Sequence, residues 1–131
     1  MLFRSASAQR VAEVIAAGAE GVRVGTPFVA AIESGAHPEY VAALIAARGE
    51  EDTILTTQFN DGWPDAPHRA LRSAVKRAKE LDFHVVSPPS RWAVAPVGHM
   101  ALYAGGGVGE VRAIRPAAEI VADLVRLLPA D

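Results

Sequence analysis

The segment from Gly21 to Phe28 constrains the fold of this chain more than any other; it reads GVRVGTPF. Its first five residues predict a short buried strand, and the Gly-Thr pair predicts the turn that ends it. Pro27 then fits the first position of a helix, where its missing N–H costs little. A further helix is expected over residues 7–17, because valine and isoleucine recur there at helical spacing. Helix, strand and helix in succession are typical of an α/β fold with parallel strands.

The Gly25–Thr26 turn also has the chemistry of an anion site. A glycine lets an anion approach the backbone, and Thr26 is the expected N-cap of the helix that follows. The free N–H groups and the positive end of the helix dipole would then face the anion. Many strand-to-helix turns contain Gly-Thr and bind nothing, so a purely structural turn is the alternative for this pattern alone.

The remainder of the chain is expected to be rich in helices. Apolar spacing predicts helices over residues 27–32, 38–48, 67–81 and 116–128, and a β-prone run predicts a short strand over residues 53–57. Prolines between residues 83 and 100 predict an irregular connector, and the glycine-rich run 104–109 predicts a loop that can approach a ligand. A basic stripe is expected to be solvated, with phosphate or partner binding as the alternative; it comprises Arg69, Arg72, Lys76 and Lys79.

Composition narrows the classes of function. The chain has 131 residues, half of them hydrophobic, which is enough for one domain with a core but not for two. A net charge of −2 gives no reason to expect a nucleic-acid or acidic-membrane binder. The absence of cysteine excludes disulfides and thiolate chemistry and fits a cytoplasmic location. No secretory signal, no membrane span and no metal-hydrolase or triad motif is recognised.

Four segments, in the same order along the chain, resemble the nitronate monooxygenases, formerly called 2-nitropropane dioxygenases. They are residues 18–30, 33–40, 67–73, and 103–109 followed by 116–121. The resemblance implies the C-terminal part of a (β/α)8 TIM barrel: the last strand plus a helix-rich C-terminal extension. A complete barrel needs about 250 residues. The resemblance begins only in the helix before the last strand, so residues 1–131 are expected to form a single partial domain without the first seven strands.

FMN is the cofactor that this resemblance implies, bound at the C-terminal ends of the strands. Its phosphate would sit between the loop after the seventh strand and the Gly-Thr turn after the eighth, in agreement with the general phosphate site of such barrels. Gly25 and Thr26 match the second half of that site, and Tyr103, Gly105 and Gly106 match part of the pocket wall.

Two departures from the family follow from the same comparison. The Gly-Gly loop after the seventh strand and the family's histidine are expected to lie before residue 1, so His37 and His68 are interpreted as structural. The family's glycine loop usually reads Ala-Gly-Gln-Gly, whereas this chain has Gly106 in place of the glutamine.

The implied function is FMN-dependent oxidation of an alkyl nitronate with dioxygen, to which this chain would contribute phosphate anchoring and part of the pocket wall. An upstream barrel segment or self-association would have to complete the site, and the isolated chain is expected to be inactive. Two alternatives are open: a non-catalytic remnant or partner-completed module of the family, and a fragment resembling the flavin-dependent enoyl-acyl carrier protein reductases, which share the barrel.

Overall fold

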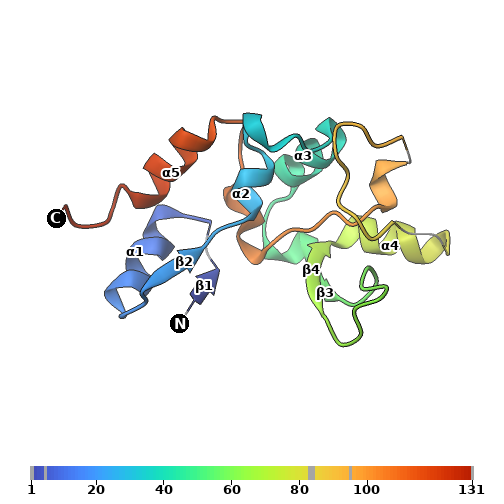
Figure 1. Ribbon diagram of the computed structural model, residues 1–131, viewed down its shortest axis with the longest axis horizontal. Helices are drawn as coiled ribbons and strands as arrows, with labels where there is room; N and C mark the ends of the chain where they lie inside the picture. The colour runs from blue at the N-terminus through green and yellow to red at the C-terminus, as the bar shows by residue number, and fades with distance from the viewer. Residues whose placement is uncertain (1, 5, 83–84, 95, 131) are drawn as a thin grey trace.

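The computed structural model describes residues 2–4, 6–82, 85–94 and 96–130 as a mixed α/β, helix-rich chain with two ends (Figure 1). One end contains β1 (Leu2–Arg4), α1 (Ala8–Ala16), β2 (Gly21–Arg23) and α5 (Ala117–Val125). The other contains α3 (Pro38–Ala46), β3 (Thr53–Thr56), β4 (His68–Leu71) and α4 (Arg72–Glu80). The short helix α2 (Thr26–Val29) lies between the two ends.

A parallel β-α-β unit opens the chain. β1 pairs in parallel with β2, with Phe3 opposite Val22, and α1 connects the two strands. α1 ends in a Schellman motif: Gly18 has φ +95°, its N–H donates to Ile15 O, and the N–H of Ala19 donates to Val14 O. The predicted helix and strand are therefore present. However, the prediction that the strand is buried was wrong, because with a single neighbouring strand β2 contains no buried residue.

The second sheet is antiparallel, although the alternation of elements had favoured parallel strands. β3 pairs with β4, with Ile54 opposite Ala70, and residues 102–104 add a further extended segment beside β4. The helix predicted over 67–81 was wrong at its start, because His68–Leu71 form β4 instead. Leu71 donates its N–H to Leu102 O, so its backbone belongs to the sheet, and the helix begins only at Arg72.

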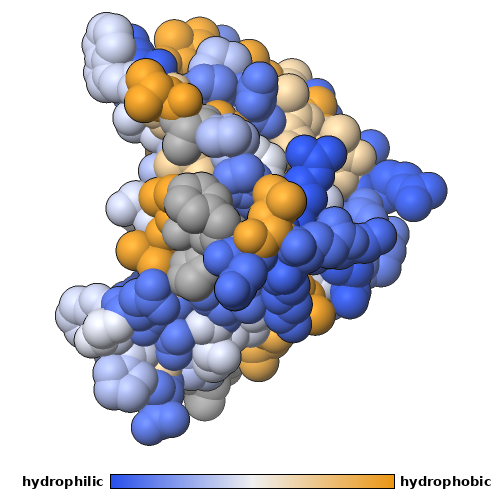
Figure 2. Space-filling view, turned by 90° about the vertical axis from the view of Figure 1, so that its right-hand side faces the viewer, coloured by the Kyte–Doolittle hydropathy of each residue, from blue (hydrophilic) through white to orange (hydrophobic). Residues whose placement is uncertain are grey.

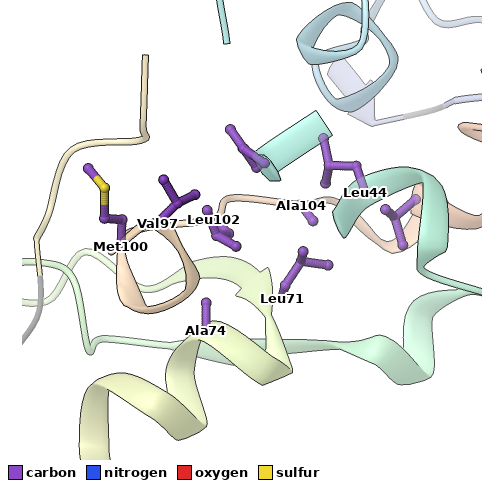
Figure 3. Close-up of a cluster of buried hydrophobic side chains, with 9 residues drawn as sticks. Leu44, Leu71, Ala74, Val97, Met100, Leu102 and Ala104 are labelled. Atoms are coloured by element: carbon purple, nitrogen blue, oxygen red, sulfur yellow. The ribbon is translucent and has the colours of Figure 1, made fainter. Parts of the chain in front are cut away.

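The largest core lies where α3, α4 and the segment 97–108 meet, and Figure 3 shows most of its side chains pointing toward one another. It consists of Tyr40, Leu44, Leu71, Ala74, Val97, Met100, Leu102, Ala104 and Val108. A separate, smaller core holds α5 against α1 at the other end of the molecule; it contains Val11, Ala31, Ile120 and Leu124. The space between these two cores is where the candidate site forms.

Hydrophilic side chains predominate on the end of the molecule formed by α4 and the connector, with apolar side chains scattered among them (Figure 2). Lys76 and Lys79 are exposed there, as predicted for the basic stripe. Arg69 is not part of such a stripe. It lies in β4, is half-buried, and donates to Thr53 Oγ1 at 3.0 Å. No helix in the described part of the chain is long and apolar enough to cross a membrane.

Candidate functional site

A cavity of about 1030 Å³ lies between the two ends of the molecule. It is lined by the β1–α1 turn, the carboxyl end of β2, α2, the start of β4, residues 88–90 and the glycine loop. All five residues predicted to bind the cofactor are on its wall: Gly25, Thr26, Tyr103, Gly105 and Gly106. The structure therefore brings the Gly25–Thr26 turn and the glycine loop together from distant parts of the sequence.

The Gly25–Thr26 turn differs in one respect from its prediction. Gly25, not Thr26, is the N-cap of α2, and the N–H of Phe28 donates to its carbonyl. Thr26 is instead the first helical residue, and its Oγ1 accepts a hydrogen bond from the N–H of Gly105 at 2.9 Å. The threonine therefore joins the turn to the glycine loop. A Cβ added to Gly25 would meet no atom within 4 Å, so the backbone of this turn is open on the cavity side.

Besides Thr26, the glycine loop lies against two other parts of the fold. A Cβ on Gly107 would come within 2.6 Å of the Cβ of Ala6, which brings the loop against the β1–α1 turn. A Cβ on Gly106 would lie 3.2 Å from Cδ of Glu50. A side chain at position 106 would therefore require the exposed Glu50 carboxylate to shift by a few tenths of an ångström.

Two tyrosines hold the segment that precedes the glycine loop. The hydroxyl of buried Tyr40 donates to the carbonyl of Tyr103 at 2.6 Å, and the Tyr103 hydroxyl donates to Val86 O at 2.8 Å. Burial, and secondarily the neighbouring Tyr103, raises the pKa of Tyr40 well above its usual value. Burial also raises the pKa of Tyr103. Both phenols are therefore neutral hydrogen-bond donors at neutral pH.

The two histidines singled out from the sequence have structural contacts. His37 is the N-cap of α3, and its Nδ1 accepts from the N–H of Glu39 at 3.2 Å. His68 lies on the cavity wall, 5.1 Å from Tyr103 in an edge-to-face arrangement, with Nδ1 3.2 Å from Ala66 O. Its buried Nε2 has no hydrogen-bond partner among the described residues.

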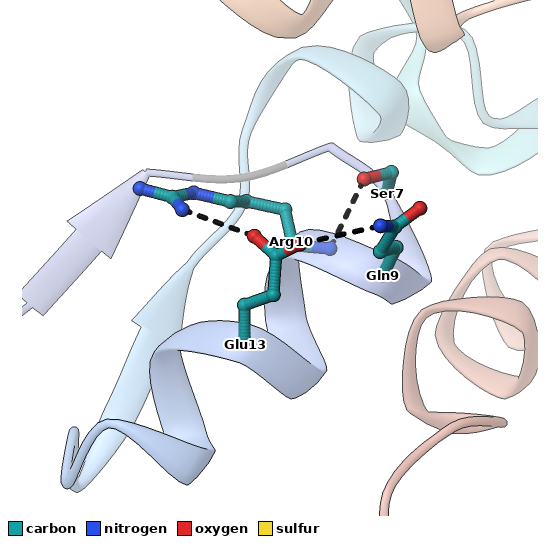
Figure 4. A network of polar contacts seen from close by, with 4 residues as sticks. All are labelled: Ser7, Gln9, Arg10 and Glu13. Carbon is teal, nitrogen blue, oxygen red and sulfur yellow. Dashed lines mark hydrogen bonds and ion pairs between the residues drawn. The ribbon is translucent and has the colours of Figure 1, made fainter.

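Sequence reasoning missed the β1–α1 turn. No strand was predicted before residue 7, whereas the structure has β1 at Leu2–Arg4, and the cavity is lined by Ala6 and Ser7, which follow β1, and by Arg10 of α1. Ser7 caps α1 by accepting from the N–H of Arg10, and Glu13 binds both Gln9 and Arg10 (Figure 4). The serine cap was a usable signal, but a three-residue strand leaves too short a pattern to recognise.

Arginine dominates the charge of the cavity wall. Its charged residues are Arg10, Arg23, Arg69 and Glu110, and only the last is acidic. The described residues contain no group of three or more histidine, cysteine or acidic side chains that could hold a metal ion. The wall thus combines aromatic and apolar side chains with more cationic than anionic ones, a composition suited to an amphipathic anion.

Comparison with known proteins gives the family. The model of the nitronate monooxygenase family matches residues 6–126. The chain belongs to this family. Among nitronate monooxygenases, npaC of Metarhizium robertsii is 30% identical over 84% of this chain and 35% of its own length. Members of the family use a flavin, and this chain spans little more than a third of that relative.

Solved structures agree with the family assignment. A nitroalkane oxidase from Streptomyces ansochromogenes is 27% identical, with a TM-score of 0.70 over 97% of this chain and 38% of its own. FabK from Thermotoga maritima has a TM-score of 0.72 over 95% of this chain and 42% of its own, and at 23% identity it shows a shared fold. This member of the nitronate monooxygenase family thus matches part of two longer proteins.

Proposed function

We propose that this chain is the C-terminal, FMN-binding part of a nitronate monooxygenase barrel and forms a single partial domain over residues 1–131. In this proposal the Gly25–Thr26 turn anchors the FMN phosphate, while Tyr103, Gly105 and Gly106 form part of the wall beside the rest of the cofactor. The observation that carries the proposal is the hydrogen bond from Gly105 to Thr26, which closes both predicted segments around one cavity.

The residues present fit the cofactor in three respects. First, Gly25 has no side chain and no atom lies within 4 Å of where its Cβ would be, so an anion can reach the backbone. Second, the Thr26 oxygen already accepts a hydrogen bond from Gly105, and its own hydroxyl proton can be donated to a phosphate oxygen. Third, the cavity of about 1030 Å³ is at the upper end of the size range of ligand sites.

The chemistry of the oxidation would come from the cofactor. When bound, FMN supplies the electron acceptor for oxidation of a nitronate and is reoxidised by dioxygen. The chain's own contribution is binding and orientation: the turn holds the phosphate end, and the Tyr40–Tyr103 hydrogen bond fixes the wall on which the rest of the ligand rests. Since neither tyrosine titrates near neutral pH, this support does not change across the physiological range.

The sheet at this end of the molecule also fits a partial barrel. β1 and β2 form a two-stranded parallel sheet, whereas parallel sheets are normally covered on both faces and continued by further strands. An apolar groove beside it is lined by Val11, Ile15, Val22, Val24, Phe28, Val121, Leu124, Val125 and Leu128. We infer that an upstream barrel segment, or self-association, covers this surface in the functional protein.

Titration of FMN with the purified chain tests the proposal, with quenching of flavin fluorescence as the readout. Gly25→Ala places a methyl group in the anion cradle, and Gly21→Ala is the matched control. Neither added Cβ meets an atom within 4 Å, but only Gly25 lines the cavity. We expect wild type and Gly21→Ala to bind FMN and Gly25→Ala to bind at least about tenfold more weakly, because a phosphate contact would be lost.

Failure to bind FMN, both by the wild-type chain and by a protein reconstituted with upstream barrel segments, would overturn the proposal. Binding without oxidation of an alkyl nitronate is the expected result for the isolated chain. If a reconstituted protein with upstream segments also fails to oxidise nitronates, the non-catalytic alternative is favoured. Consumption of NAD(P)H that depends on an enoyl thioester would instead favour the reductase alternative.

A further inference from the structure

We propose that one part of the cavity binds the hydrocarbon chain of the substrate, so that the protein takes nitronates with an uncharged alkyl chain of several carbons. This inference rests on the proposed function and names the class of substrate that the same cavity selects. Four carbon-rich residues form the surface in question, and we call them the hydrocarbon wall: Val29, Ala36, Pro88 and Pro89. All four line the cavity, although they come from α2, the segment before α3 and the connector between α4 and the glycine loop.

Backbone hydrogen bonds hold the connector beside the segment before α3. The N–H of His37 donates to Pro89 O at 3.0 Å, and the N–H of Arg91 donates to Gly35 O at 2.9 Å. The two segments also form an antiparallel bridge at Ala36. The Arg91 guanidinium lies against Gly35, but Arg91 is not among the described residues that line the cavity. Ala36 and Pro89 therefore lie beside each other on the cavity wall.

Val29 joins the same surface from α2. The Ser34 hydroxyl donates to Val29 O at 2.6 Å and accepts from the N–H of Ala36 at 3.2 Å, so one side chain bridges the two residues. Val29 and Ala36 also both pack against the largest core of the molecule, which contains buried Tyr40. The hydrocarbon wall is thus held in place from behind by that core.

Polar side chains beside the hydrocarbon wall already make hydrogen bonds within the protein. Ser34 uses its hydroxyl as both donor and acceptor, and the Ser90 hydroxyl accepts from the N–H of Trp92 at 3.3 Å. The Tyr40 hydroxyl donates to Tyr103 O. The two prolines have no N–H to offer. A ligand therefore meets mainly carbon here, and a polar or charged group buried against this surface would lose its hydration without gaining a partner.

The charged residues that line the cavity belong to other segments, namely α1, β2, β4 and the end of the glycine loop. They are Arg10, Arg23, Arg69 and Glu110. An alkyl nitronate has an anionic head and an apolar chain, so we expect its head on the side of the arginines and its chain on the hydrocarbon wall. Each methylene group buried there should strengthen binding by about fourfold.

Calorimetric titration with straight-chain carboxylates, from propanoate to heptanoate, tests the inference on FMN-saturated protein, either the chain itself or the chain reconstituted with upstream barrel segments. Carboxylates carry the planar anionic head of a nitronate but are not oxidised by a flavin. Heptanedioate is the matched ligand, because it has the length of heptanoate with a charge at the far end. Val29→Thr puts a hydroxyl on the wall at nearly the same volume, and its control is Val121→Thr, on α5 and outside the described lining of the cavity.

We expect the affinity to rise about fourfold per methylene in wild type and in Val121→Thr. Heptanedioate should bind at least about tenfold more weakly than heptanoate, and Val29→Thr should weaken heptanoate binding by about tenfold while leaving propanoate binding unchanged. An affinity that does not depend on chain length, or equal binding of heptanedioate and heptanoate, would refute the hydrocarbon wall while the proposed function stands. Equal weakening of every carboxylate by Val29→Thr would refute it too. If FMN binds neither to the chain nor to the reconstituted protein, the proposed function itself fails.

Discussion

Replacing Tyr40 with phenylalanine tests how the wall of the cavity is held in place. Tyr40 is 2% exposed, and its hydroxyl donates to the carbonyl of Tyr103 at 2.6 Å. Tyr40→Phe keeps the packing of the ring but removes this donor, so the Tyr103 carbonyl loses its partner and faces the buried phenylalanine ring instead. Loss of such a bond costs about 1–3 kcal/mol, because the buried acceptor keeps its full desolvation penalty.

Urea unfolding followed by far-UV circular dichroism measures this cost directly. Tyr103→Phe is the matched control: it removes the hydroxyl that donates to Val86 O at 2.8 Å, but that side chain is only partly buried and lines the cavity. Water can replace the lost hydroxyl as the donor to Val86 O, so the free energy of unfolding of Tyr103→Phe should fall by less than about 1 kcal/mol. If Tyr40→Phe is as stable as wild type, or if the two variants lose equal stability, the reasoning is refuted.

Four further predictions concern stability and the site. Because burial raises the pKa of Tyr40 above its ordinary 10.0, its contribution to stability is complete below pH 10 and falls above it, by up to about 1.4 kcal/mol per pH unit; urea titrations from pH 8 to 11 should show a steeper fall in wild type than in Tyr40→Phe, where only the raised pKa of Tyr103 remains. Leu44→Ala, at a fully buried position, should lose about 2–5 kcal/mol by denaturation, and Leu55→Ala, at a position 59% exposed, less than about 0.5 kcal/mol. Thr26→Val removes the acceptor for the Gly105 N–H, so hydrogen exchange at that amide should become faster and FMN binding weaker, whereas unchanged exchange would contradict the bond. Gly107→Ala should lower the free energy of unfolding by about 1–3 kcal/mol, because the added Cβ would clash with Ala6. A melting temperature equal to that of wild type would contradict this close contact.

The local sequence pattern was sufficient to predict several helices and strands. The helix that ends at Gly18 and the strand at Gly21 follow from spacing and from a glycine suited to a left-handed C-terminal cap, and both are present. The five predicted site residues were found from the resemblance and from the chemistry of the Gly-Thr turn, and the structure brings them together on one cavity wall. Their binding of FMN stays a prediction.

What local pattern missed depends on contacts between distant segments. Leu71 has the spacing of a helical residue, yet its backbone pairs with Leu102, and no property of residues 67–81 alone reveals that partner. Thr26 is a good N-cap by residue type, but its hydroxyl is used by a loop far along the chain. Arg23 and Arg10 read as ordinary surface arginines until the fold places both on the cavity wall.

The hydrogen bond between Gly105 and Thr26 has a consequence for how the chain acquires its structure. The two residues are 79 positions apart in the sequence, and a second hydrogen bond, from the Ala117 N–H to the Glu33 carboxylate, joins residues 84 positions apart. Closing such long loops costs conformational entropy before any contact repays it, so folds that depend on them form slowly. During synthesis, the Gly-Thr turn leaves the ribosome well before the glycine loop has been made. We therefore expect the helices to form first and the cavity last, with the apolar surfaces on either side of it exposed to chaperones in the interval.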